Sequence, residues 1–183
     1  MTEREAVVAG VVAAAGGRLI GRVRLQKAIY LLDQLGLQSG FTYEYHHFGP
    51  FSREVDIATL DAQEFLGLKE EFARRESDGA RYSIFNFNGP VGEDAYGTLG
   101  RERASSLLAT FEGTNVTVLE LAATIDWLWR FERSNDWRSE LVKRKGQKVE
   151  NGKLDRALDL LSSLGLSPQE PIATANSAVS AIQ

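Results

Sequence analysis

The chain contains no cysteine and only two histidines among its 183 residues. Without cysteine it can form no disulfide, no thiolate nucleophile and no cysteine-ligated zinc site. Long apolar runs are also missing, because the longest one near the start, residues 6–15, is too short to cross a bilayer. No basic leader precedes this run, and a glycine pair rather than a cleavage site follows it. We therefore expect a soluble, cytoplasmic protein that does not enter a membrane.

The chain also lacks a large excess of either charge sign, since its net charge is −4 at pH 7. This balance argues against wholesale binding to nucleic acid or to an anionic membrane. Two basic clusters nevertheless stand out, one in residues 130–148 and one that consists of Arg18, Arg22, Arg24 and Lys27. Each is either a solvated face or a footprint for phosphate or an acidic partner.

The N-terminal third has the periodicity of two helices joined by a glycine-containing turn. Thr2 can cap a first helix that runs to about Ala15, and "AGGRLIG" then predicts a turn. A second helix over residues 22–35 carries the apolar stripe of a half-buried helix and ends at Gly36. Two helices in this arrangement, with basic residues at the start of the second, are typical of a helix-turn-helix.

An aromatic strand and a hairpin follow. The run "FTYEYHHF" alternates as a strand does, and Gly49-Pro50 should stop it. Ser52 suits the N-cap of a third helix that reaches about Leu66, and Asp78-Gly79 predicts a hairpin turn. This order is winged-helix-like, although the strand lies after the second helix rather than in the commoner place after the first.

The remainder predicts three more helices. The first covers residues 98–111, and the second begins at a capping box over residues 117–120. The third covers residues 152–164 and ends at Gly165. We expect a mainly α (α+β) fold. A winged-helix-like part over residues 1–90 should pack on a helical part over residues 91–166 as one compact unit. Residues 167–183 predict a mobile tail, since they offer no apolar stripe.

The adjacent histidines, His46 and His47, are the best candidates for chemistry because imidazole titrates near neutrality. On a strand, however, neighbouring side chains point to opposite faces, so the pair cannot easily grip one metal or share one proton. We expect no catalytic residue, no metal site and no cofactor, and we do not expect an enzyme.

Four stretches together resemble a known group: "LQKAIYLLDQLG", "YHHFGPFSREVD", "TVLELAATIDWL" and "LDRALDLLSSLGL". They resemble the Panacea (SocA-like antitoxin) and YwgA-like bacterial and phage proteins over most of residues 20–165. The resemblance implies a mostly α domain without known catalysis. In antitoxin members this domain binds and neutralises an unrelated toxin, and some members work with a protease. It also implies a shared core motif of Tyr45, Phe48, Gly49, Pro50, Phe51 and Ser52.

We therefore predict a non-catalytic protein-binding module of the antitoxin or adaptor type, whose partner is a toxin encoded by a neighbouring gene. The predicted partner-binding residues are Tyr45, His46, His47, Phe48, Phe51, Ser52 and Arg53. The alternative is a winged-helix DNA-binding regulator that places Arg18, Arg22, Arg24 and Lys27 on phosphates and uses the hairpin as a wing.

Overall fold

The computed structural model describes residues 3–169 and confirms a mainly α, α+β fold. Its α-helices are α1 (Arg4–Ala14), α2 (Arg22–Gln34), α3 (Arg53–Asp61), α4 (Arg101–Gly113), α5 (Val116–Arg130), α6 (Trp137–Lys145) and α7 (Lys153–Leu164). Short helical turns are η1 (Ala62–Leu66), η2 (Glu93–Tyr96) and η3 (Gly146–Val149). The strands are β1 (Arg18–Ile20), β2 (Glu44–His46), β3 (Gly49–Phe51), β4 (Lys69–Arg74) and β5 (Arg81–Asn86).

An antiparallel sheet in the order β1-β5-β4 contains the predicted hairpin and one strand that the sequence did not predict. The strand β1 occupies part of "AGGRLIG", where only a turn was expected. Three residues are too few to show alternation, and the partner strand β5 lies far along the chain, with Arg18 opposite Asn86. A strand therefore does stand in the commoner winged-helix place after the first helix.

The prediction for the aromatic stretch "FTYEYHHF" was also wrong. It does not run as one strand up to Gly49-Pro50, because β2 ends at His46 and β3 begins at Gly49. The two strands pair antiparallel, with Tyr45 opposite Pro50, and His47 and Phe48 form the turn. Proline is tolerated here because, among residues 3–169, β3 pairs with β2 alone, so its other edge needs no backbone donor.

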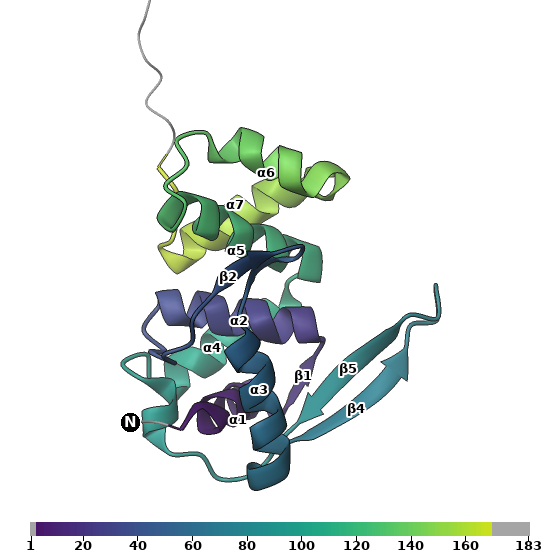
Figure 1. The fold of residues 1–183 in the computed structure, drawn as a ribbon, viewed down its shortest axis with the longest axis vertical. Coiled ribbons are helices and arrows are strands. Elements are labelled where there is room, and N and C mark those ends of the chain that lie inside the picture. The colour runs from purple at the N-terminus through teal and green to yellow at the C-terminus, as the bar shows by residue number, and fades with distance from the viewer. Residues whose placement is uncertain (1–2, 170–183) are drawn as a thin grey trace, which may run out of the picture.

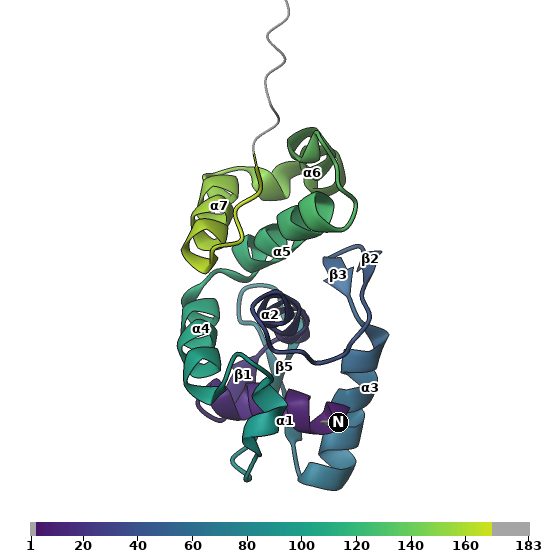
Figure 2. The same cartoon turned by 90° about the vertical axis from the view of Figure 1, so that its left-hand side faces the viewer.

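The helix α2 lies at the centre of the molecule. Seen end-on in Figure 2, it is surrounded by α1, α3, α4, α5 and the β2–β3 hairpin. Eight consecutive residues of α2, from Leu25 to Leu32, are buried. The helices α5, α6 and α7 form a layer at one end of the molecule, and the β4–β5 hairpin extends away from the helices (Figure 1). Of the charged residues early in α2, Lys27 therefore faces protein, Arg24 is partly buried and Arg22 is exposed.

Helix ends agree with the predictions in part. Ser52 caps α3 by accepting a hydrogen bond from the Val55 N–H at 3.4 Å, and Gly165 ends α7 in the left-handed conformation, both as predicted. The N-cap of α5 is Asn115 rather than Thr117, because the Asn115 side chain accepts the Thr117 N–H. The helix α6 was not predicted. Thr2 and the chain beyond residue 169 lie outside the described residues, among which no helix is long and apolar enough to cross a membrane.

Candidate functional site

The β2–β3 hairpin presents several ring side chains at the surface. His46 and His47 are exposed, and Phe48, on the turn, is 46% exposed. The His46 ring stacks on the half-buried Phe51, with 4.6 Å between ring centroids. The His47 ring meets Phe48 edge to face, with centroids 4.9 Å apart. Each histidine therefore packs against a phenylalanine of the same hairpin.

The hairpin is seated on α5 through Gly49. This residue has φ of +89°, and a Cβ placed on it would lie 2.5 Å from the Thr124 Oγ1 of α5. Both the left-handed backbone and the close approach require glycine. The "GP" of the sequence motif therefore marks a point of contact between the hairpin and α5.

Two neighbouring residues of α2 also bind backbone groups of the hairpin and of Ser52, which follows it. The Gln26 side chain donates to the Ser52 carbonyl at 2.9 Å and accepts the Ser52 N–H at 3.0 Å. Lys27 donates from Nζ to the Pro50 carbonyl at 2.5 Å. The stretches "LQK" and "GPFS" are thus joined by three hydrogen bonds, which gives their joint occurrence a physical reason.

A cluster of charged residues lies where α5, α6 and η3 meet the turn. Glu120 of α5 accepts hydrogen bonds from Lys145 Nζ at 2.8 Å and from Lys148 Nζ at 2.9 Å. Lys145 also donates to the His47 carbonyl at 3.0 Å, so that it fixes the backbone of the turn. Lys145 and Lys148 therefore share a single carboxylate, whose negative charge also acts on Lys27.

Burial lowers the pKa of Lys27 from its ordinary value of 10.5 to about 8. Glu120 raises this pKa, while the positive charges of Lys145 and Lys148 lower it further. Burial also lowers the pKa of Lys145, against the opposing effect of Glu120. Both pKa changes follow from taking ammonium groups out of water.

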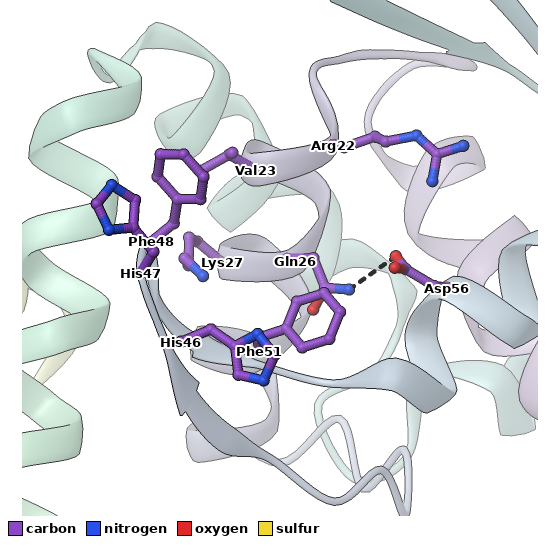
Figure 3. A pocket seen from close by; sticks show the side chains of 9 residues that line it. All are labelled: Arg22, Val23, Gln26, Lys27, His46, His47, Phe48, Phe51 and Asp56. Atoms are coloured by element: carbon purple, nitrogen blue, oxygen red, sulfur yellow. Dashed lines mark hydrogen bonds between the residues drawn. The ribbon is translucent and has the colours of Figure 1, made fainter.

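A pocket of ≈ 330 Å³ opens between the hairpin and the start of α2. Figure 3 shows Lys27 in the middle of its lining, with His47 and Phe48 to one side and Gln26 and Phe51 to the other. Its lining residues are Arg22, Val23, Gln26, Lys27, His46, His47, Phe48, Phe51 and Asp56. The pocket thus has largely apolar walls and a buried cation.

The predicted partner-binding residues fall into three groups. His46, His47, Phe48 and Phe51 come together at the pocket. Arg53 is exposed at the start of α3 and does not line the pocket. Tyr45 is half-buried with the Arg144 guanidinium over its ring at 4.4 Å, and Ser52 is buried as the cap of α3. Tyr45 and Ser52 therefore contribute to the structure of the hairpin and of the start of α3, and their role in partner binding stays a prediction.

The four predicted phosphate-binding residues do not form one exposed patch. Arg22 makes two hydrogen bonds to Glu70 of β4, at 3.0 and 2.8 Å. Arg24 donates to the carbonyls of Phe111 and Thr114 at the end of α4, and burial lowers its pKa. Lys27 is buried, whereas Arg18 is exposed on β1.

Sequence reasoning missed Gln26 and Glu120 and placed Lys145 and Lys148 only within a general basic cluster. Glu120 did carry a signal, because it is one of two acidic residues, with Asp126, in a mainly apolar helical run. An ionisable residue in such a run is almost always paired when it is buried. Its partners follow only from the fold, since they lie in or beside α6, which was not predicted.

Comparisons with known proteins bear on the family resemblance. No protein-family model matches the chain. The uncharacterised protein YwgA of Bacillus subtilis is 26% identical to it over 152 residues, which cover 81% of this chain and 89% of the relative. This similarity supports the YwgA-like half of the resemblance, and the SocA-like antitoxin half stays a prediction.

Proposed function

We propose that the chain is a non-catalytic protein-binding module of the antitoxin or adaptor type, which holds a partner protein against the β2–β3 hairpin. The observation that carries the proposal is Phe48, an aromatic side chain 46% exposed on a turn whose backbone is held by Lys145. Aromatic side chains, phenylalanine among them, are enriched in protein interfaces relative to the rest of the protein surface.

The support of the turn matters as much as the exposed ring. Gly49 rests on Thr124, and the carbonyls of His47 and Pro50 are bound by Lys145 and Lys27. A turn ordered in advance loses little conformational entropy when a partner binds, so more of the contact energy appears as affinity. Following the resemblance, the partner is a toxin encoded by a neighbouring gene.

The alternative, a DNA-binding regulator, has less support from the arrangement of the helices. The second helix of the predicted helix-turn-helix is α2, which is enclosed by protein. The helix before the β4–β5 hairpin is α3, with Glu54 and Asp56 in its first turn and with exposed Ile57 and Leu60. Acidic and apolar side chains on such a helix do not neutralise phosphates.

The test compares Phe48→Ala with Phe65→Ala, a change at a phenylalanine that is 70% exposed on η1. Each variant is checked for folding, then measured for binding to the purified product of the neighbouring gene and for growth rescue against it. We expect Phe48→Ala to weaken binding about 30-fold, the equivalent of an anchor worth about 2 kcal/mol. Arg53→Glu should also lose the partner, whereas His46→Gln, His47→Gln and Phe65→Ala should keep it.

Two results would contradict the proposal. Retained binding in Phe48→Ala with loss in Phe65→Ala would move the docking surface to α3 and η1. A specific, salt-sensitive complex with a fragment of the protein's own promoter, abolished by Arg22→Ala together with Arg24→Ala, would favour the DNA-binding alternative.

A further inference from the structure

The charge cluster beside the hairpin is not balanced. The carboxylate of Glu120 is shared by Lys145 and Lys148. Lys27 is 1% exposed, and no described residue forms an ion pair with it. Its hydrogen-bond acceptor is the Pro50 carbonyl, although an ammonium group has three N–H donors.

A buried ammonium in this position is costly. Removing a charge from water is unfavourable unless the charge is paired and hydrogen-bonded. The neighbouring positive charges add to this cost, as the lowered pKa of Lys27 reflects. An anion in the pocket would supply the missing acceptor and the missing negative charge.

The walls of the pocket restrict what such an anion carries. Val23, Phe48 and Phe51 contribute apolar surface, while the amide of Gln26 is already bonded to the Ser52 backbone and Asp56. Arg22 at the rim is paired with Glu70. A volume of ≈ 330 Å³ lies at the small end of ligand pockets. One buried cation suits a singly charged head better than a phosphate.

We propose that this pocket binds a free organic acid, with the carboxylate on Lys27 Nζ and a small aromatic or branched aliphatic body between Val23, Phe48 and Phe51. The carboxylate occupies the N–H positions of Lys27 that the Pro50 carbonyl does not use. Binding of the acid needs no partner protein, although this pocket shares Phe48 with the docking surface proposed above.

The experiment titrates the purified full chain with phenylacetate by isothermal calorimetry, with phenylacetamide as the uncharged analogue of the same shape. We expect saturable one-to-one binding of phenylacetate and at least tenfold weaker binding of phenylacetamide. Lys27→Met, which removes the charge but keeps the length, should lose at least tenfold in affinity. Lys69→Met, at an exposed lysine of β4, is the matched control and should bind as wild type does.

A second variant covers the case in which Lys27→Met does not fold. Val23→Trp fills the apolar part of the pocket and leaves the Lys27 hydrogen bond in place, so it should abolish binding without loss of structure. Equal binding of phenylacetate and phenylacetamide would overturn the proposal, as would unchanged affinity in folded Lys27→Met or in Val23→Trp. Inorganic phosphate that binds more tightly than phenylacetate would overturn the assignment of a carboxylate.

Discussion

The two hairpins of this molecule are built in opposite ways. The β4–β5 hairpin has six residues in each strand and extends away from the body (Figure 1), and its turn is held by local contacts such as Arg75 with Asp78. The β2–β3 hairpin has only three residues in each strand. Its turn nevertheless lies against the body, because side chains from α2, α5 and α6 contact its backbone.

The difference shows that the length of a hairpin and its anchoring are separate properties. An isolated two-stranded hairpin is at best marginally stable in water, whatever turn it has. The long hairpin gains a third strand, β1, at its base, while its tip depends on itself. The short hairpin gains little from its ladder and much from helices that belong to other parts of the chain.

The largest expected effect comes from removing the seat of the short hairpin. Gly49→Ala places a side chain on a left-handed backbone and puts its Cβ 2.5 Å from Thr124 Oγ1. This substitution should lower the free energy of unfolding by about 3 kcal/mol. Gly79, in the turn of the long hairpin, has φ of +68°, but a Cβ added to it would have no atom within 4 Å. Gly79→Ala should therefore lower the free energy of unfolding by about 1 kcal/mol. Urea denaturation measures both values. Equal losses would mean that the two hairpins are anchored alike.

The second largest effect is a dependence of the free energy of unfolding on pH, which the lowered pKa of Lys27 causes. Its pKa is about 8 in the folded protein against 10.5 ordinarily, so between these pH values the unfolded chain binds more protons. The free energy of unfolding of the wild type should therefore rise with pH over this window, relative to Lys27→Met. At about 1.36 kcal/mol per pKa unit, we expect a relative gain of about 2 to 3 kcal/mol.

Urea denaturation at pH 7.5, 9 and 10.5 in buffers without organic acids measures this gain. Lys69→Met, at an exposed lysine, is the control and should show no comparable rise. A constant difference between wild type and Lys27→Met across these pH values would show that Lys27 is not held in a desolvated position.

The smallest effect concerns the long hairpin. Phe72 is 51% exposed on β4, with the Arg81 guanidinium over its ring at 3.6 Å. Phe72→Ala removes an exposed cation–π contact, which is worth about 0.5 to 1 kcal/mol. Thermal unfolding should show a correspondingly small decrease, with partner binding unchanged. A loss as large as that of Gly49→Ala would show that the long hairpin also packs on the body.

Local signals predicted much of this fold. Ser52 as a cap, Asp78-Gly79 as a hairpin turn and Gly165 as a helix end each depend on residues close in sequence, and all three are confirmed. The strand β1 was missed because only pairing with the distant β5 stabilises it. The helix α6 was missed because charged residues dominate it, and its buried positions include only Trp137, Leu141 and Lys145.

The sequence predicted the exposed side chains of the candidate site but not its buried lysine. The aromatic motif pointed to His46, His47, Phe48 and Phe51, which do meet at one pocket. Lys27 was assigned to an exposed basic cluster, because four cations close in sequence are usually solvated. Its burial depends on the hairpin folding over α2, and composition and periodicity carry no information on such a tertiary contact.

The bonds from Gln26 and Lys27 to the hairpin have a consequence for how this protein can evolve. They end on the carbonyls of Pro50 and Ser52 and on the Ser52 N–H, and Lys145 ends on the His47 carbonyl. Main-chain groups are the same whichever side chains accompany them. Mutations at His47 and Phe48 can therefore accumulate while the turn keeps its shape, so that under the function proposed above descendants of this chain could change partners without first acquiring a new scaffold.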